Sequence, residues 1–210
     1  SSFKKYLADK TKKNKTIIGN EIWGLKEDSL HNIWIGTDKG ISCYDTRADT
    51  FRNISSESPG KSIVPFWATR DEVFCWDNPE RQLAAFNIHT FAKRSLARLK
   101  DTDSVGFAIT EQYAIFDPGS NSVWMEKAFS GKRGGLLQVS LADGKRNEFN
   151  WPCYKKIPNH SHFSEGMCYD PKRNSIWISS PDVLMDFTLN DKKFHLIDAL
   201  SEIVNQKDFW

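Results

Sequence analysis

The chain has 210 residues, enough for one large domain or one to two ordinary ones, and its net charge of +2 gives no electrostatic basis for binding nucleic acid. It contains no apolar run of the roughly 20 residues that a membrane-spanning helix needs, and its four Cys, without a CxxC pair, are too few for a disulfide scaffold. Aromatic residues make up 13% of the chain, which favours stacked sheets over disorder or a helical bundle.

Four copies of a short, β-rich sequence recur along the chain. In each copy a polar residue leads into a β-branched residue and then an aromatic one, as in Asn32-Ile33-Trp34. The aromatic residues are Trp34, Phe74, Trp124 and Trp177, at spacings of 40, 50 and 53 residues. Because self-similarity at such a period is typical of repeat architectures, each copy is interpreted as one strand of a repeated unit.

Three more strands are predicted around each copy. One precedes it (residues 22–25, 65–68, 113–116 and 167–169), one follows it (40–45, 82–87, 135–140 and 183–188), and an outer strand is centred on Phe51, Phe91, Phe149 and Phe194. Four strands in units of this length predict an all-β fold made of β-propeller blades, about four four-stranded antiparallel sheets. The alternative, an ordinary β-sandwich, does not explain why the same strand sequence returns.

Two of the predicted turns have closely similar sequences. Asp117-Pro118 is followed by Asn121, and Asp170-Pro171 is followed by Asn174. Asp, Pro and Asn are the residues that polar turns require, so both stretches predict a hairpin between two strands.

The whole chain, residues 1–210, is interpreted as one propeller segment. The predicted blades are 17–58, 61–100, 104–152 and 160–200. Residues 1–10 are expected to be the outer strand of a preceding blade, and residues 201–210 to enter a following one. Five candidate outer strands with only four sets of inner strands favour a part of a larger propeller over a closed four-bladed ring.

The stretch from Ile22 to Asp45 resembles the two-component regulator propeller repeat. It has the acidic pair of that repeat, a short turn, the strand sequence Ile-Trp-Ile-Gly-Thr, a glycine, and then Tyr-Asp. The second blade keeps only the aromatic positions Phe74 and Phe86. The third and fourth blades keep their Trp but have Glu126-Lys127 and Ser179-Ser180 in place of Gly-Thr.

This resemblance implies the extracytoplasmic sensor region of a hybrid two-component histidine kinase from polysaccharide-consuming gut bacteria. The segment would then be periplasmic, would respond to a carbohydrate, and would signal to a kinase elsewhere in a longer chain. It would catalyse nothing itself, and the sequence contains no kinase signature, phosphate-binding loop or Gly-x-Ser-x-Gly motif.

The positions of the first blade that match the repeat also have structural explanations. A glycine at Gly36, just past Trp34, lets a neighbouring chain approach closely, and the Thr37 hydroxyl can hold the following turn. Asp28 is expected to accept backbone N–H groups in the hairpin before Trp34. These roles identify a scaffold and not a ligand.

Ligands of propellers usually bind near the central channel, where loops lead into the innermost strands. The residues predicted to bind a ligand there are Asn20, Glu21, Trp23, Phe66, Trp67, Phe107, His162 and Glu165. The Trp side chains would stack on a sugar ring while the polar ones bond its hydroxyls. The competing interpretation is that the aromatic residues only pack one blade on the next. The expected partners are an oligosaccharide, other blades or domains of the sensor, and a second copy in a homodimer.

Two other functions remain alternatives. The Glu165-Gly166-Met167 sequence is similar to the start of calcium-dependent lactonase propellers, but matching metal ligands are not found in the earlier blades. His160 and His162 lack the spacing of a zinc site, so no metal or cofactor is predicted. A structural or partner-binding propeller is the second alternative. Pairing of the cysteines at 43, 75, 153 and 168 is left open.

Overall fold

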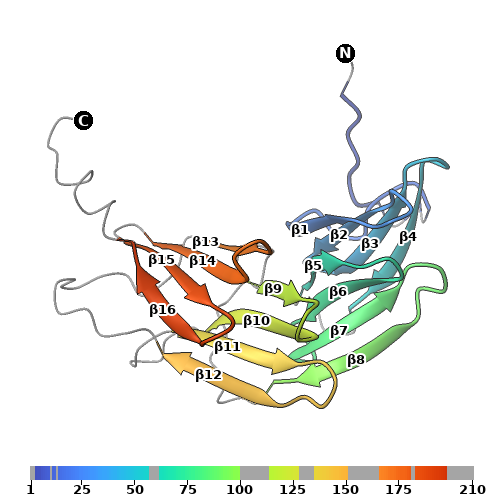
Figure 1. The fold of residues 1–210 in the computed structure, drawn as a ribbon. Helices are drawn as coiled ribbons and strands as arrows, with labels where there is room; N and C mark the ends of the chain where they lie inside the picture. Colours follow the sequence, from blue (N-terminus) through green and yellow to red (C-terminus); the bar gives the residue numbers. More distant parts are fainter. Residues whose placement is uncertain are drawn as a thin grey trace, which may run out of the picture. The chain divides into compact units, whose positions relative to one another are not determined.

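The computed structural model describes residues 3–9, 11–12, 14–56, 62–99, 114–127, 135–150, 166–180 and 183–197 (Figure 1). All regular secondary structure within these ranges is β-strand, and it forms four separate four-stranded sheets. In each sheet, strands that follow one another in the chain are antiparallel neighbours. This meander of four strands, repeated four times, is the fold of β-propeller blades and confirms the predicted fold class.

The strand bounds follow the predicted repeat. The first sheet contains β1 (Ile22–Glu27), β2 (Ile33–Thr37), β3 (Gly40–Asp45) and β4 (Thr50–Ser55). The second contains β5 (Ile63–Ala68), β6 (Glu72–Asp77), β7 (Gln82–Asn87) and β8 (Lys93–Arg98). The third contains β9 (Ala114–Asp117), β10 (Ser122–Lys127), β11 (Gly135–Ser140) and β12 (Arg146–Asn150), and the fourth contains β13 (Gly166–Asp170), β14 (Ser175–Ser180), β15 (Val183–Thr188) and β16 (Lys193–Leu196).

The hairpin turns form where the turn residues predict them. The Asp117 carboxylate accepts the Gly119 N–H at 2.9 Å, and the chain reverses into β10 at Asn121, whose φ is +46°. The Asp170 carboxylate accepts the Lys172 N–H at 2.9 Å, and Asn174 has φ of +51°. Asn tolerates this left-handed conformation better than most residues, so both Asp-Pro turns are confirmed.

The described strands belong to two compact units, the first with β1–β8 and the second with β9–β16. In the first unit, the core between the first two sheets contains Trp34, Ile41 and Cys43 of the first sheet together with residues of β5, β6 and β7. In the second unit, Trp124 of β10 and Phe187 of β15 lie in the corresponding core. Each sheet lies inside one predicted blade range. The blade bounds and the single propeller segment stay predictions.

The residues before β1 lie on the first sheet. Residues 3–9 form no strand in the described structure. They belong to an irregular segment, here called the N-terminal arm (the described residues of 3–21), and their role as the outer strand of a preceding blade stays a prediction. Asn14 accepts the Phe51 N–H at 2.9 Å, and Tyr6 and Ile17 pack on the same face. Residues 201–210 lie outside the described residues.

Candidate functional site

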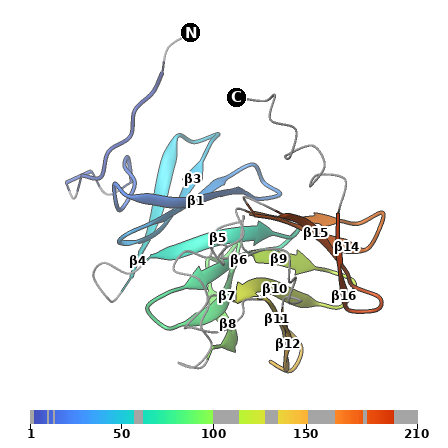
Figure 2. The same cartoon turned by 90° about the vertical axis from the view of Figure 1, so that its left-hand side faces the viewer.

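The innermost strands of the first two sheets, β1 and β5, lie side by side (Figures 1 and 2). Two glycines allow this approach. A Cβ on Gly36 would lie 2.5 Å from the Ile63 carbonyl oxygen, and a Cβ on Gly24, its cross-strand partner, would lie 2.9 Å from Val64. Any side chain at these positions would collide with β5, so the predicted reason for Gly36 is confirmed.

Thr37 holds the turn that follows the glycine. Its hydroxyl donates to the Gly40 carbonyl at 3.1 Å and accepts the Lys39 N–H at 3.2 Å. Gly40 has φ of +134°, a conformation that L side chains rarely adopt. The Gly-Thr-x-x-Gly sequence is therefore explained by the tight β2–β3 hairpin, and no ligand is needed to account for it.

Asp28 is buried and organises the β1–β2 hairpin. One carboxylate oxygen accepts the N–H groups of Leu30 and Asn32 at 2.8 and 3.0 Å, and the other accepts the indole N–H of Trp34 at 2.8 Å. The expected backbone bonds are confirmed, and the bond to Trp34 is an addition that sequence reasoning missed. In the fourth sheet, the indole N–H of Trp177 similarly donates to the Asp170 carboxylate.

Apart from Phe3 and Leu7 of the N-terminal arm, the most exposed large apolar side chains of the described chain lie on the inner strand of the first sheet. Ile22, Trp23 and Leu25 are 53%, 44% and 52% exposed. A bulge between Ile22 and Gly24 shifts the register against β2 at this point, and places Trp23 at an irregular position of the strand. Bulges commonly re-aim a side chain, and here an exposed indole stands beside the exposed Glu21.

The predicted binding residues have different environments. Trp23 and Glu21 are exposed and Trp67 is half-buried, so these three are accessible to a ligand. Asn20 is exposed, but its side-chain oxygen accepts the Ala8 N–H at 2.7 Å and so holds the N-terminal arm. Phe66 is a correction: its side chain is wholly buried, near the ring of Phe74, at a bulge between Pro65 and Trp67. The predicted residues Phe107, His162 and Glu165 lie outside the described residues.

One further side chain of this surface was missed. Lys26 of β1 places its ammonium group 5.6 Å from the ring centre of Trp67 on β5. The cation–π contact joins the inner strands of the two sheets. The only feature of the sequence that indicates Lys26 is its position two residues after Gly24, which places it on the face of β1 that is turned to β5. We call the side chains of Glu21, Trp23, Lys26 and Trp67 the inner-strand surface.

The three described cysteines are all free thiols, and two of them are buried between the first two sheets. Burial raises the pKa of Cys43 to about 12, and burial also raises the pKa of Cys75. A thiol with so high a pKa is almost entirely protonated at neutral pH and reacts slowly. Cys168 of β13 is exposed, and Cys153 lies outside the described residues.

Within the described ranges, no group of three or more His, Cys, Asp or Glu side chains is placed to hold a metal ion. His160, His162 and Glu165, on which the metal alternatives depend, lie outside those ranges. The same part of the chain contains no helix that is long and apolar enough to cross a membrane.

The family match lies in the sequence of the first blade. Residues 16–39 match the two-component regulator propeller family. The match covers the end of the N-terminal arm, β1, the Asp28 hairpin and β2, which are the parts that carry Gly36 and Thr37. A search of curated proteins finds no match.

Solved structures share the propeller fold. The chain is similar to the extracellular domain of a putative one-component system from B. thetaiotaomicron, with a TM-score of 0.55 and 15% identity over 91% of this chain and 22% of that one. It is similar to the extracellular domain of a putative hybrid two-component system from the same organism, with a TM-score of 0.53 and 15% identity over 85% of this chain and 24% of that one. A chain of a nidogen/laminin complex gives a TM-score of 0.57 at 10% identity, over 83% of this chain and 64% of that one.

These likenesses show the fold. The matching structures come from regulatory systems and from a nidogen/laminin complex, which have different roles. The matched repeat family is named for two-component regulators, and the first two structures are extracellular domains of regulatory systems. The chain spans less than a quarter of the length of those two structures.

Proposed function

We propose that this chain is a ligand-sensing segment of the extracytoplasmic propeller of a hybrid two-component regulator. It would lie in the periplasm, respond to a carbohydrate, and pass the signal to a histidine kinase elsewhere in a longer protein. Its partners would be an oligosaccharide, the other blades and domains of the sensor, and a second copy of the sensor. The regulator propeller match over residues 16–39 is the observation that carries the proposal.

The inner-strand surface supports a carbohydrate ligand. An exposed indole such as Trp23 offers a flat apolar face to the C–H groups of a sugar ring. The exposed Glu21 next to it offers a carboxylate that accepts bonds from sugar hydroxyls. Lys26, on the same strand as Trp23 and beside Trp67 of the neighbouring strand, supplies N–H donors. Apolar rings with a few polar groups around them are the usual composition of a small-molecule site.

The proposed mechanism needs no chemical step in this segment. A ligand that binds one arrangement of two sensor protomers more tightly than another shifts the population toward that arrangement. The rigid, glycine-spaced contact of β1 with β5 would transmit such a bias better than a loop. The size of the effect is limited by the difference in ligand affinity between the two arrangements.

The test is calorimetric titration of this chain, and of the full ectodomain, with a panel of neutral and acidic oligosaccharides. Trp23→Ala is expected to weaken binding of the active fragment by about tenfold, because the stacking contact is worth roughly 1–1.5 kcal/mol. Leu30→Ala is the matched control, since Leu30 is also an exposed apolar residue but lies in the β1–β2 turn. An ectodomain that binds no fragment, or equal affinities for both variants, would contradict the proposal.

A further inference from the structure

The hairpins that join the first two strands of the third and fourth sheets have the same backbone frame. The last residue of β9 pairs with the first residue of β10, and β13 pairs with β14 in the same register. In both hairpins the chain reverses at an Asn with positive φ, and a Trp follows the Asp at the same separation along the chain. The backbone therefore presents Trp124 to Asp117 in the arrangement that the fourth sheet has for its own Trp and Asp.

The hydrogen bonds within the two hairpins differ even so. In the fourth sheet, the indole N–H of Trp177 donates to the Asp170 carboxylate, and in the first sheet Trp34 donates to Asp28 at 2.8 Å. Trp124 is wholly buried, yet its indole N–H has no acceptor among the described residues. A buried donor without an acceptor is costly, so this N–H favours any arrangement of the hairpin that gives it one.

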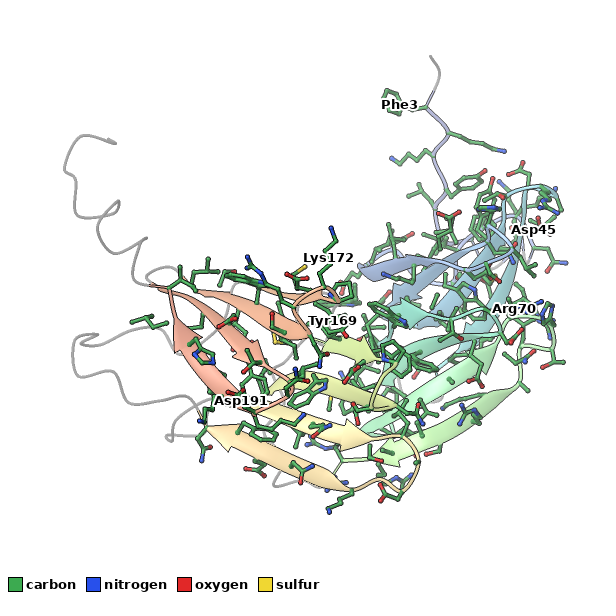
Figure 3. The ribbon with its side chains drawn as sticks, in the orientation of Figure 1. Phe3, Asp45, Arg70, Tyr169, Lys172 and Asp191 are labelled. Carbon is green, nitrogen blue, oxygen red and sulfur yellow. The ribbon has the colours of Figure 1, made fainter. Side chains whose placement is uncertain are left out.

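A serine hydroxyl occupies the carboxylate oxygen that the indole would need. Asp117 is buried, and one of its oxygens accepts a backbone N–H of the turn while the other accepts the Ser120 hydroxyl at 2.6 Å. In the fourth hairpin, Lys172 points away from the sheet (Figure 3), and Arg173, at the position of Ser120, keeps its Nε 4.0 Å from Asp170. That distance is too long for a hydrogen bond. The Ser120 hydroxyl is therefore what distinguishes the third hairpin.

The two possible donors to Asp117 are closely matched. The bond from Ser120 is charge-assisted, which makes it stronger than a bond between neutral groups. Ser120 is exposed, however, so its hydroxyl can donate to water when it leaves the carboxylate. The buried indole of Trp124 has no such substitute. A small rotation of the carboxylate would exchange one donor for the other without breaking the backbone frame.

The fourth sheet contacts the ring at which this exchange takes place. The ring centre of Phe187 lies 5.4 Å from that of Trp124, and the Lys192 ammonium group lies 4.6 Å from the same ring centre. Burial lowers the pKa of Lys192 and the charge of Asp117 acts in the opposite direction, so these two charges lie close enough to interact. A movement of the indole or of the carboxylate therefore changes contacts with the fourth sheet.

We propose that Asp117 is a two-position switch in the third sheet, with its carboxylate bonded to the Ser120 hydroxyl in one state and to the Trp124 indole N–H in the other. The structure contains the first state, and the first and fourth sheets show the bond that defines the second. Because Lys192 and Phe187 lie on the Trp124 ring, the exchange couples this hairpin to the packing of the fourth sheet on the third. This inference does not depend on the proposed ligand.

The test is ¹H–¹⁵N NMR spectroscopy of the full chain with ¹⁵N-labelled tryptophan, in which Trp124→Phe serves only to assign the signal. In the wild type, the Trp124 indole N–H is expected upfield of the bonded Trp34 and Trp177 signals. Ser120→Ala removes the competing hydroxyl, so the Trp124 signal is expected to move downfield toward them. Its exchange with deuterium is expected to slow by about tenfold, the factor that one ordinary hydrogen bond contributes to an equilibrium.

Two control variants separate the hydroxyl from a general effect of the substitution. Ser120→Thr keeps a hydroxyl at this position and is expected to keep the wild-type signal. Ser29→Ala is the matched control in the first hairpin, because Ser29 follows Asp28 but donates to the Arg70 carbonyl at 2.7 Å. It is expected to leave the Trp34 signal where it is.

Two further measurements identify the acceptor and the coupling. In the Ser120→Ala background, Asp117→Asn replaces the carboxylate with a weaker, neutral acceptor and is expected to reverse most of the downfield shift. The side-chain methylene signals of Lys192, which lies over the Trp124 ring, are expected to move in Ser120→Ala and to stay unchanged in Ser29→Ala.

Four results would overturn the proposal. The first is a wild-type Trp124 signal that already coincides with the bonded signals, and the second is a Ser120→Ala signal that stays at the wild-type position. The third is a downfield shift that Asp117→Asn does not reverse, which would assign the acceptor to another group. The fourth is an unchanged Lys192 side chain in Ser120→Ala, which would show that the fourth sheet does not respond to the hairpin.

Discussion

The first two sheets have the same four-stranded topology, but they hold their hairpins by different means. In the first, one buried carboxylate, Asp28, binds two backbone N–H groups and the indole of Trp34. In the second, Phe74 stands in place of that Trp, and the Thr69 hydroxyl accepts the Glu72 N–H at 3.1 Å. The repeat sequence is therefore one way to stabilise this hairpin. A blade without that sequence can form the same hairpin with other hydrogen bonds.

The second sheet also contains a buried carboxylate, and this one lies beside a lysine ammonium group. Asp77 is buried, forms an ion pair with Lys93, and accepts the Gln82 side-chain amide at 3.2 Å. Ser95 in turn donates to Gln82 at 2.7 Å. These partners come from three strands, so this network depends on sheet register, whereas the Asp28 contacts depend on one short turn.

The largest expected effect is on the contact that the two sheets share. Gly36→Val would place its side chain against the Ile63 carbonyl and Pro65, and we expect it to lower the free energy of unfolding by about 3 kcal/mol. Urea denaturation measures the change. Gly166→Ala is the control, since a Cβ there would have only the Ser179 hydroxyl at 4.0 Å, and it should change stability little. Equal effects of both variants would refute the close-approach explanation.

The next largest effect is expected in the first sheet and not in the second. Asp28→Ala leaves two backbone N–H groups and the Trp34 indole without their acceptor, and we expect a loss of about 2 kcal/mol. Asp71→Ala, at an exposed carboxylate of the second sheet's hairpin, is the control and should have little effect. The tryptophan emission is expected to change in Asp28→Ala alone, and unchanged stability would show that the turn is held by other groups.

Lys93→Met tests the network of the second sheet. It leaves the buried Asp77 carboxylate without its counter-ion, and we expect a loss of about 1.5 kcal/mol, less than for a fully buried pair because Lys93 is partly exposed. Lys39→Met, at an exposed position of the first sheet, is the control. A double variant with Asp77→Asn should recover part of the loss, and no recovery would mean that Lys93 acts only by packing.

A smaller, pH-dependent effect is expected at the edge of the second sheet. Arg94 donates to both oxygens of Glu72, at 2.6 and 2.7 Å, and these bonds lower the pKa of Glu72. A carboxylate with a lowered pKa stabilises the fold above its unfolded-state pKa, and the contribution is lost as the pH falls through the lowered value. Arg94→Gln should therefore cost about 0.5 kcal/mol at pH 7 and nothing at strongly acid pH. Arg47→Gln, exposed on the first sheet, should show no such pH dependence in denaturation curves.

The last prediction concerns the reactivity of the cysteine thiols and involves no change in stability. Cys43 and Cys75 lie in the core that the first two sheets share, whereas Cys168 is exposed. Brief alkylation of the native chain, followed by peptide mass spectrometry, should label Cys168 and leave Cys43 and Cys75 unlabelled until denaturant is added. Early labelling of Cys43 would show that the two sheets separate in solution.

The sequence predicted the strands well because each depends on a local pattern. The recurring aromatic residues, the Asp-Pro turns and the role of Asp28 all follow from residues within one hairpin. The bulges at Ile22 and Pro65 could not be predicted, since an alternating pattern does not show where one extra residue enters a strand. Phe66 was expected at a binding surface because it lies near the start of an innermost strand, but each residue from Ile63 to Phe66 is buried.

Contacts between distant segments were missed for a related reason. Lys26 meets Trp67, and Tyr6 meets Tyr44, only because two sheet faces or an arm and a sheet are brought together in space. No spacing in the sequence indicates these pairs. The arm was interpreted as the outer strand of a preceding blade because Phe3 to Tyr6 has the composition of one, and composition alone does not indicate its contacts with Tyr44 and Phe51.

The Asp28 hairpin has a consequence for how such a protein can change over generations. All the bonds of its carboxylate go to residues 30 to 34, so the information for this turn is contained in seven consecutive residues. A duplicated or transplanted stretch of gene would carry the whole device with it and fold the same turn in a new context. Repeats of this kind can be duplicated without the need for new long-range contacts. Later copies can then lose the Asp28 hairpin once neighbouring blades stabilise them.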